Sequence, residues 1–345
     1  MARQRAFCDQ LKLFRAGEAG YFTYRIPAMV VSPGGAVLAF AEARKHTGAD
    51  DDEINLVLKR SLDDGVSWQP MQLLFEDGGR SVNQPTPIVD TITGKVVLVF
   101  CKDNREVFVS TSSDEGITWS APVEITQAVA DPSWAYVGTG PGHGIQLSSG
   151  RLLAPCWADL TPGALVEREQ VQQFSYAAFS DDHGTTWQRG KPMDMDRSDE
   201  CMAIETVDGS VYMDMRSRQE QRCRAHAWSH DAGGTWSEVL NSQNLPEPSC
   251  QGSIVRYGSD KKGDENLIIM AHPAEQTTRA RLTLLTSTNE CRSWSIAAVL
   301  CEGYSGYSDL TVSPDKTILC LYETDRCRAL TVARFNQVWI KRHEA

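Results

Sequence analysis

The eight residues Ser61-Leu62-Asp63-Asp64-Gly65-Val66-Ser67-Trp68 follow the pattern S-x-D-x-G-x-x-W, which recurs along the chain. Four further copies begin downstream, the last of them degenerate: Ser112, Ser180, Ser229 and Ser287. In the degenerate copy Asn289 replaces the aspartate and Cys291 replaces the glycine. The third positions of successive copies are 51, 68, 49 and 58 residues apart. A repeat at this spacing is typical of a chain built from a series of similar sheets.

Each copy has the composition of a tight turn between two strands. An Asp side chain accepts hydrogen bonds from nearby backbone N–H groups, Gly adopts positive φ, and Trp packs back beneath the loop. Short β-rich runs flank the copies, among them residues 54–58, 96–100 and 209–213. Helical periodicity is nearly absent, and the one stretch of helix-like composition, residues 165–174, predicts a short helix or lid in a long loop.

Length alone leaves the number of domains open, because 345 residues are compatible with one domain or two. A period of about 57 residues leaves room for six units. We therefore expect a single all-β domain over residues 1–345, folded as a six-bladed β-propeller with four-stranded blades.

The composition argues against several classes of partner. The formal net charge of −11 makes nucleic acid and anionic membrane surfaces unexpected partners, because both require clustered Lys and Arg. No apolar run approaches the length that spans a bilayer, so we expect no transmembrane segment. Residues 1–9 lack the apolar stretch and cleavage site of a secretory signal, which predicts a cytoplasmic protein unless a signal has been removed.

Cysteine spacing gives no indication of a metal centre. The ten cysteines contain no C-x-x-C pair, so neither a structural zinc site nor any other metal or cofactor is expected. An even number of cysteines in a chain of this length is weak evidence for disulfides. Reduced, mostly buried thiols are the favoured interpretation.

The repeats resemble the Asp boxes of the sialidase (neuraminidase) superfamily, and Tyr24-Arg25-Ile26-Pro27 resembles the N-terminal arginine motif of that family. The resemblance covers nearly the whole chain. It implies an exo-α-sialidase, a glycoside hydrolase that removes terminal sialic acid with retention of configuration through a tyrosine nucleophile. The implied substrates are sialylated glycoproteins, glycolipids such as gangliosides, or oligosaccharides, and a monomer is expected.

Sialic acid carries a carboxylate on its anomeric carbon, so an enzyme that binds it needs fixed positive charge from planar, forked donors such as arginine. The family pattern has three arginines from separate blades, which the resemblance places at Arg25, Arg216 and Arg279. Arg216 lies on the return strand of a pair that opens at Glu200. Arg281 remains an alternative to Arg279, because residues two apart share one face of a strand.

The carboxylate of the substrate also explains the choice of nucleophile. An ionised Asp or Glu would be repelled by it, whereas a neutral tyrosine is not, and sialidases are an exception to paired-carboxylate chemistry for this reason. The family's tyrosine matches Tyr307 in the segment 306–310. Because the reference pKa of tyrosine is about 10, forming the phenolate at neutral pH costs roughly 4 kcal/mol without a base. The family's glutamate base matches Glu200, with Glu205 as the local alternative.

Departure of the leaving group requires a general acid. The family places an aspartate a few residues after an arginine that follows the first long strand. That arginine matches Arg44 and the aspartate matches Asp50, with Asp51 and Asp52 as adjacent alternatives. Arg44 is expected beside the carboxylate pocket, where its charge favours the ionised forms of nearby acids.

Further residues complete the expected pocket. Glu323 resembles the residue that holds the first arginine, here Arg25, in place. The subsites for the glycerol and N-acyl groups of the sugar match polar and aromatic positions on other blades: Asn83 with Gln84, Trp157 and Gln251. Tyrosine is commoner than tryptophan at the position of Trp157 in the animal cytosolic relatives, which leaves the preferred C5 substituent (acetyl, glycolyl or the hydroxyl of Kdn) open.

Two other functions compete with simple hydrolysis. A non-catalytic sialic-acid-binding propeller would lack one of Tyr307, Glu200 or Asp50, and all three are present. A trans-sialidase or an intramolecular variant would share these residues and differ in how water enters the site. Such relatives often carry an added lectin domain, for which the chain has no remaining length, so hydrolysis is the favoured hypothesis.

Overall fold

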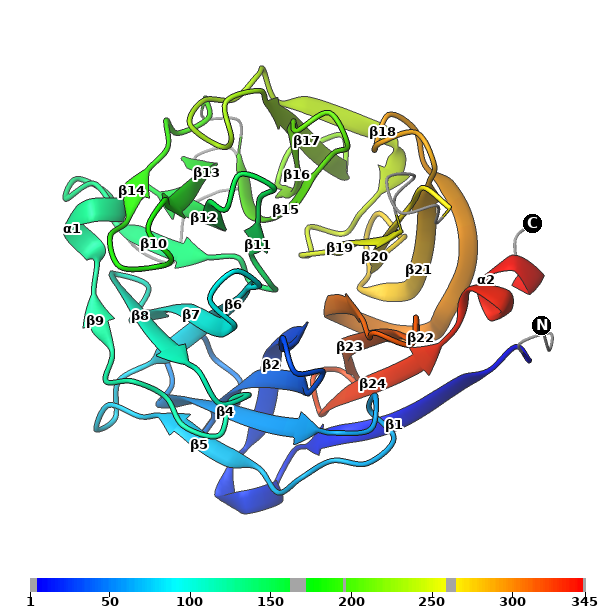
Figure 1. Ribbon diagram of the computed structural model, residues 1–345, viewed down its shortest axis with the longest axis horizontal. Helices are drawn as coiled ribbons and strands as arrows, with labels where there is room; N and C mark the ends of the chain where they lie inside the picture. The colour runs from blue at the N-terminus through cyan, green and yellow to red at the C-terminus, as the bar shows by residue number, and fades with distance from the viewer. Residues whose placement is uncertain (1–4, 162–171, 195–196, 259–264, 344–345) are drawn as a thin grey trace.

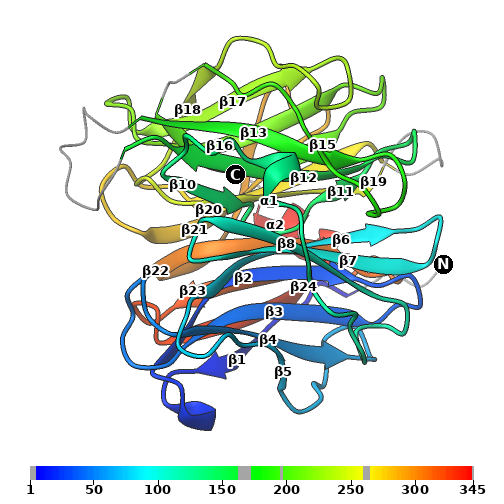
Figure 2. The ribbon, with the colours of Figure 1, turned by 90° about the vertical axis from the view of Figure 1, so that its left-hand side faces the viewer.

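The computed structural model describes residues 5–161, 172–194, 197–258 and 265–343. In this part of the chain the structure is all-β, and its antiparallel sheets are arranged in a ring around a central axis (Figure 1). Seen from the side, the ring is edge-on and the strands of successive sheets lie one above another (Figure 2). This arrangement is that of a β-propeller.

Four sheets follow the order of the chain, and in three of them each strand pairs with the next. The first contains β2 (Thr23–Val31), β3 (Val37–Arg44), β4 (Ile54–Ser61) and β5 (Gln72–Phe75). The second contains β6 (Val82–Asp90), β7 (Lys95–Lys102), β8 (Glu106–Ser112) and β9 (Val123–Glu124). The third contains β10 (Tyr136–Thr139), β12 (Leu152–Asp159), β13 (Gln173–Ser180) and β14 (Gln188–Arg189), with β11 (Ile145–Gln146) also paired to β12. The fourth contains β15 (Ser198–Glu205), β16 (Val211–Ser217), β17 (Cys223–Ser229) and β18 (Leu240–Pro246).

The remaining strands form one seven-stranded sheet in the order β1-β24-β23-β22-β21-β20-β19. Their bounds are β1 (Cys8–Arg15), β19 (Ser253–Gly258), β20 (Leu267–Pro273), β21 (Ala280–Ser287), β22 (Ser295–Val312), β23 (Ile318–Thr324) and β24 (Ala329–Phe335). The long strand β22 pairs with β21 up to residue 304 and with β23 from residue 305 onward. It therefore belongs to two successive groups of four strands.

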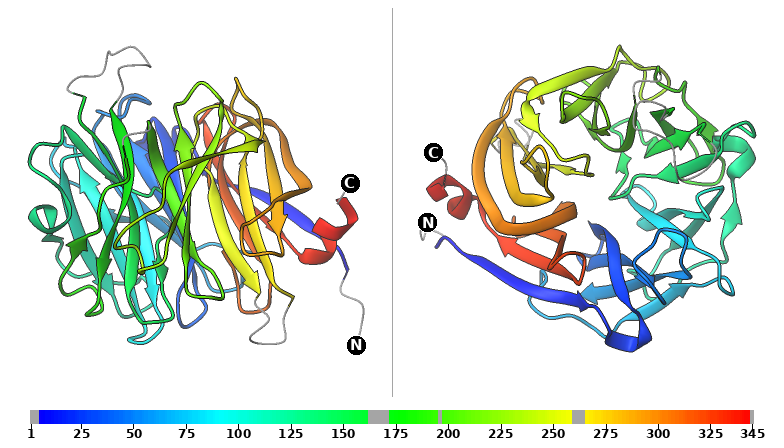
Figure 3. Two further views of the ribbon diagram at one scale, coloured as in Figure 1. Left: turned by 90° about the horizontal axis from the view of Figure 1, so that it is seen from above. Right: turned by 180° about the vertical axis from the view of Figure 1, so that it is seen from behind.

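The ring is closed by the two ends of the chain. Strand β1 runs antiparallel to β24, so the first strand completes the group formed by the last three (Figure 3). Around the axis, the innermost strands β2, β6, β11, β15, β19 and β22 contact one another in turn, and β22 contacts β2 again. The helical elements lie at the periphery: η1 (Glu18–Gly20), α1 (Thr126–Val129) and α2 (Gln337–His343). Among the described residues, no helix has the length and apolar character needed to cross a membrane.

The turn predicted from the repeat is confirmed in its hydrogen bonds. In the first copy the backbone N–H of Gly65 donates to Ser61 Oγ at 2.9 Å, and that of Ser67 donates to Asp63 Oδ1 at 2.8 Å. The indole of Trp68 donates back to the Gly65 carbonyl at 3.2 Å, and Gly65 has the expected positive φ of 80°. The two backbone bonds recur in every later copy, including the degenerate one.

Two of the three predicted β-rich runs lie within strands, residues 54–58 in β4 and 96–100 in β7. The third is partly wrong, because β16 begins only at Val211 and Gly209 lies in the preceding turn with positive φ. The predicted helix or lid over 165–174 falls mainly outside the described residues. Its last two residues are strand, since Gln173 and Phe174 pair with β12.

The hydrophobic core lies between neighbouring sheets. One cluster joins the first two sheets through Phe40, Leu98 and Phe100, and another joins the first sheet to β23 and β24. All ten cysteines are free thiols, seven of them buried, in agreement with the expectation of reduced, mostly buried cysteine. Because the apolar residues are used between the sheets, the inner strands are free to carry polar side chains at the axis.

Candidate active site

Polar residues converge where four inner strands depart from regular pairing. The register shifts between Arg25 and Ala28 in β2, and equivalent shifts occur in β6, β15 and β22 at the following pairs: Asn83 and Thr86, Ser198 and Cys201, and Ser305 and Ser308. A β-bulge redirects the side chains beside it. Ile26 and Gln84 have left-handed φ values of 55° and 57° within two of these bulges. The bulges thus aim residues of four strands at a common centre.

At that centre Tyr307, Glu200 and Arg216 form a hydrogen-bonded triangle. The Tyr307 hydroxyl donates to Glu200 Oε1 at 2.6 Å, while Arg216 Nη1 donates to the Tyr307 hydroxyl at 2.8 Å and to Glu200 Oε2 at 2.5 Å. Burial raises the pKa of Tyr307 well above its ordinary value, although the charge of Arg216 acts in the opposite direction. The phenol is therefore protonated, and its hydroxyl already donates a hydrogen bond to the Glu200 side chain.

Two further guanidinium groups lie over the tyrosine ring. The Cζ atoms of Arg25 and Arg279 are 5.5 Å and 5.1 Å from the centroid of Tyr307. Together with Arg216 they bring three positive charges to one buried aromatic side chain. Fixed arginines grouped in this way are able to pair with a carboxylate.

Glu323 is a buried carboxylate that links two of these groups. Its Oε1 accepts a hydrogen bond from Arg25 Nε at 3.0 Å, and its Oε2 accepts one from the backbone N–H of Tyr307 at 3.3 Å. Burial alone would raise the pKa of Glu323, but the charges of Arg25 and Arg279 lower it below its ordinary value. Gly306 permits this approach, since a Cβ there would lie 2.2 Å from Glu323 Oε2.

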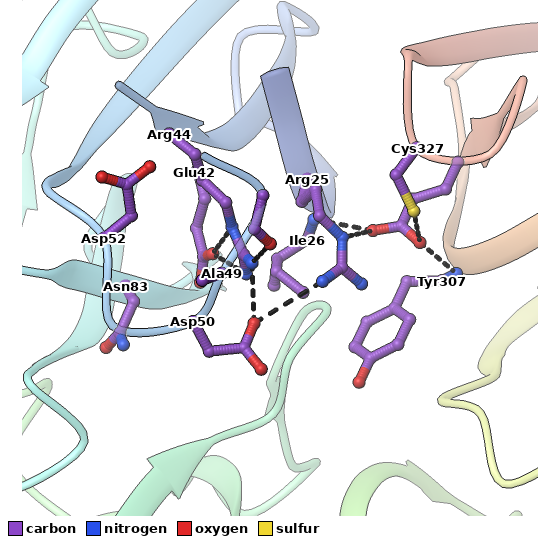
Figure 4. Close-up of polar contacts among 12 residues, drawn as sticks. Arg25, Ile26, Glu42, Arg44, Ala49, Asp50, Asp52, Asn83, Tyr307 and Cys327 are labelled. Carbon is purple, nitrogen blue, oxygen red and sulfur yellow. Dashed lines mark hydrogen bonds and ion pairs between the residues drawn. The ribbon is translucent and has the colours of Figure 1, made fainter. Parts of the chain in front are cut away.

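Asp50 lies across the site from the tyrosine (Figure 4). Its Oδ1 is 2.7 Å from Arg44 Nη1 and 3.5 Å from Arg25 Nη1, while its side chain is 83% exposed. Loss of solvation would by itself raise the pKa of Asp50. The positive charges of Arg44 and Arg25 outweigh this effect and lower the pKa. Arg44 is itself held by the buried Glu42 through a 2.8 Å ion pair.

Comparison with known proteins identifies the family of the chain. Residues 35–320 match the family described as BNR repeat-like domain. Sialidase-3 of Mus musculus is 32% identical to the chain, and the aligned region covers 90% of each protein. The chain belongs to the sialidase family. It is accordingly a glycoside hydrolase, as are the sialidases that it resembles.

Other sialidases are similar over most of this sialidase-family chain. The sialidase of Micromonospora viridifaciens is 29% identical, covering 94% of this chain and 53% of that protein. The solved Hadza microbial sialidase Hz136 superposes with a TM-score of 0.85 at 26% identity, over 95% of this chain and 68% of that one. The Trypanosoma rangeli sialidase in complex with the inhibitor DANA shares the fold, with a TM-score of 0.77 at 21% identity, over 97% of this chain and 61% of that one.

The structure separates the expected residues from their local alternatives. Asp51 has no hydrogen bond or ion pair to the site, and Asp52 accepts bonds from the backbone N–H groups of His46 and Thr47 within its own loop. Glu205 accepts two hydrogen bonds from Ser148, away from Tyr307.

The two candidate arginines near the start of β21 also differ. Arg281 is half-exposed and pairs with Glu275 and Glu302, each at 3.4 Å. Its φ of 58° and the register shift between Ala280 and Leu282 explain why it does not share the surroundings of Arg279. Only Arg279 reaches the tyrosine ring.

The expected subsite residues have mixed placements. Asn83 is buried beside Ser81 and Asn104, and the Oδ1 atom of Asn83 has no hydrogen-bond partner among the described residues. The backbone N–H of Gln84 donates a hydrogen bond to Glu42 Oε1 at 3.0 Å. The ring of Trp157 packs so closely on Gly138 that a Cβ there would lie 2.2 Å from it.

Gln251 differs from the expectation of a sugar contact. It is 1% exposed, and its amide is bonded to Ser308 at both ends, with Oε1 accepting from Ser308 N and Nε2 donating to Ser308 O, each at 3.0 Å. Its amide also donates to the Pro141 carbonyl at 3.2 Å. Gln251 therefore holds the backbone of β22 in place at Ser308, next to Tyr307.

Three supporting residues were not identified from the sequence. Glu42 holds Arg44, and the two share one face of β3, so strand alternation was an available signal. Asp199 lies 3.6 Å from Arg216, and the Ser249 carbonyl accepts a bond from Arg279 at 3.2 Å. No local pattern distinguished these two. In the described part of the chain, no group of three or more His, Cys, Asp or Glu side chains is arranged to hold a metal ion.

Proposed function

We propose that this protein is an exo-α-sialidase that hydrolyses terminal sialic acid from glycoconjugates with retention of configuration, using Tyr307 as nucleophile. The observation that carries the proposal is the hydrogen bond of 2.6 Å from the Tyr307 hydroxyl to Glu200, enclosed by Arg25, Arg216 and Arg279. A nucleophile within hydrogen-bond reach of a base, next to an anion site, is the arrangement that this substrate requires.

Binding follows from charge. The carboxylate of sialic acid pairs with Arg25, Arg216 and Arg279, which places the anomeric carbon above the Tyr307 hydroxyl. The chain has a net charge of −11, so attraction of an anionic sugar depends on this local cluster. Glu323 keeps the cluster in place through Arg25.

In the first step the Tyr307 oxygen attacks the anomeric carbon while Glu200 accepts the phenolic proton. The bond to the aglycone oxygen breaks, and Asp50 donates a proton to that oxygen. Asp50 is ionised before substrate binds, because Arg44 and Arg25 lower its pKa. A bound substrate carboxylate compensates the charge of Arg25, which raises the pKa of Asp50 and favours the protonated acid.

In the second step water attacks the anomeric carbon, and Asp50 now accepts a proton from it. Glu200 returns its proton to the leaving Tyr307 oxygen. Two displacements at the same carbon give net retention. The 83% exposure of the Asp50 side chain is consistent with access of water on this side.

Two finer structural expectations belong to this proposal. We infer six four-stranded blades, because the inner strands β2, β6, β11, β15, β19 and β22 contact in a closed sequence and β22 contributes to two groups. We also treat residues 1–345 as one catalytic domain, since one ring includes strands from near both ends of the chain.

The first experiment measures release of fluorophore from 4-methylumbelliferyl α-sialosides that carry acetyl, glycolyl or hydroxyl at C5. We expect turnover by the wild type and a loss of at least about 10³-fold in Tyr307→Phe, because the nucleophile is removed. Tyr136→Phe, on β10, is the matched control and should retain activity. NMR of the first-formed product should show the α-anomer, and the β-anomer would contradict double displacement. Binding of sialic acid without turnover on any substrate would instead indicate a non-catalytic propeller.

A further inference from the structure

A cavity adjoins the candidate active site and shares Arg25 with it. This side cavity has a volume of about 630 Å³, and its lining includes Phe22, Arg25, Gly48, Arg326 and Arg328. Arg25 therefore contacts two spaces, since its Nη1 is also 3.5 Å from Asp50. A ligand held by Arg25 in the active site has the side cavity next to it.

The side cavity borders the loop of Asp50, which in the proposed mechanism is the side from which the aglycone departs. Gly48 belongs to the loop that carries Asp50, and the Gly48 carbonyl accepts a hydrogen bond from Arg44 Nη1 at 2.6 Å. The proposed acid Asp50 must face the glycosidic oxygen, so the sugar that follows the terminal residue leaves the site along this loop. The side cavity is within reach of that sugar.

The charges of the side cavity are unbalanced. Its lining contains three arginines and no carboxylate. Arg25 is compensated by Glu323, whereas Arg326 and Arg328 are exposed and have no ion pair or side-chain hydrogen bond to any described residue. The acidic neighbour Asp325 is paired with Lys12 at 2.5 Å. In a chain of net charge −11, this local excess indicates a site for an anion.

The side cavity also offers an apolar surface for a ring. Phe22 is 56% exposed, which is unusual for a large aromatic side chain, and a Cβ on Gly48 would lie 3.9 Å from its ring. Pockets for small ligands combine such a surface with a few polar groups that set orientation. A sugar ring with its own carboxylate fits both features.

The backbone that presents the arginines is strained. Asp325, Arg326 and Cys327 have consecutive φ values of 53°, 56° and 63°, a left-handed backbone conformation that is unfavourable for residues other than Gly. Strain of this kind is retained mainly at functional sites. Here the turn places Arg326 and Cys327 in the lining of the side cavity.

We propose that the side cavity is a subsite for a second acidic sugar, so that the enzyme favours substrates in which the terminal sialic acid is attached to another sialic acid. This rests on the proposed sialidase function. The inner carboxylate pairs with Arg326 and Arg328, and the inner ring packs on Phe22.

The test compares initial rates on sialyl-α2,8-sialyl-lactose, sialyl-lactose, and sialyl-lactose with a sulfate on the galactose. For the wild type we expect kcat/KM on the disialyl substrate to exceed the others by at least fivefold at low salt, and the advantage to shrink as salt screens the charges. Arg326→Gln and Arg328→Gln should each reduce that advantage about threefold through KM, and the double variant should abolish it. Phe22→Ala should reduce it without changing its salt dependence. Arg342→Gln, on α2, is the control for net charge.

The outcomes separate the two proposals. A fluorogenic monosialoside reports the proposed function by itself, because it has no second sugar. If that substrate is hydrolysed but the disialyl advantage is absent or unchanged in the double variant, the subsite is wrong and the sialidase activity stands. An equal advantage for the sulfated substrate would show that any anion suffices and would overturn the assignment to an acidic sugar.

Discussion

At the scale of single residues, burial and two neighbouring charges have opposite effects on the pKa of the Tyr307 hydroxyl. Burial raises the pKa of Tyr307, Arg216 lowers it, and the neighbouring charge of Glu200 raises it again. The net result is a protonated phenol whose hydroxyl is already bonded to a base. In the proposed mechanism attack and proton transfer therefore occur together, and Glu200 is required for the first step.

Glu200→Gln should lower kcat on an aryl sialoside by about 10²- to 10⁴-fold, because the amide keeps the shape of the side chain but cannot accept the phenolic proton. Steady-state kinetics measure this effect. Glu205→Gln is the matched control, since the carboxylate of Glu205 accepts its hydrogen bonds from Ser148, away from Tyr307, and should change kcat by less than about twofold. A small effect at Glu200 with a large one at Glu205 would reverse the assignment.

Asp50 predicts the pH dependence of the reaction. In the proposed mechanism only its protonated form acts as general acid, and Arg44 and Arg25 lower its pKa from the ordinary value. The protonated fraction falls as pH rises, so kcat/KM on sialyl-lactose should decline from acidic toward neutral pH. Asp50→Asn should depress activity on sialyl-lactose about 10²-fold or more and depress activity on an aryl sialoside less, because a phenolic leaving group needs less protonation. Paired pH–rate profiles, with Asp51→Asn as control, check this; an equal loss on both substrates would contradict the role.

At the scale of elements, the repeats were predictable and the bulges were not. The pattern S-x-D-x-G-x-x-W determines its own turn through local hydrogen bonds, so the sequence suffices. The bulges at Arg25 and Tyr307 depend on packing between strands of different sheets, which strand alternation does not report. Alternation placed Arg279 and Arg281 on one face, whereas a register shift between them separates their surroundings.

The carboxylate of the repeat should contribute a pH-dependent part of the stability. Hydrogen bonds from Ser67 lower the pKa of Asp63 from 3.8 to about 2. A lowered pKa stabilises the fold above pH 3.8, and the contribution disappears as pH falls toward 2. Asp63→Ala should cost about 1 kcal/mol near pH 6, reduced by solvent screening, and less near pH 3. Thermal unfolding at both pH values measures this, and Asp64→Asn, which has no such bonds, should show no pH-dependent difference.

At the scale of the whole molecule, the period of the repeat predicted the propeller, but nothing in it predicted how the ring closes. Strand β1 carries no copy of the repeat, and its partner β24 is more than 300 residues away. Phe14 on β1 packs with Tyr24 of β2 at a centroid distance of 5.3 Å, and both belong to the core cluster that includes β23 and β24. Closure therefore depends on tertiary contacts that local patterns do not encode.

Phe14→Ala should destabilise the whole ring by about 3–5 kcal/mol, because it leaves a cavity where the first and last groups of strands meet. Denaturant unfolding measures the change. Leu11→Ala, three residues earlier on the same strand and 44% exposed, should cost less than about 0.5 kcal/mol. Similar losses for the two variants would show that β1 does not hold the ring closed.

Closure also determines when the enzyme becomes active during its synthesis. Arg25 leaves the ribosome early, but Tyr307 and Glu323, which complete its surroundings, follow only after almost all the intervening sheets have been made. In a nascent chain that lacks β22 and β23, Arg25 has no Glu323 to pair with, and Glu200 has no Tyr307 hydroxyl to accept a hydrogen bond from. Under the proposed function, activity therefore requires a chain that extends at least through β23, and we expect no hydrolysis of sialosides by an amino-terminal fragment that stops short of β22.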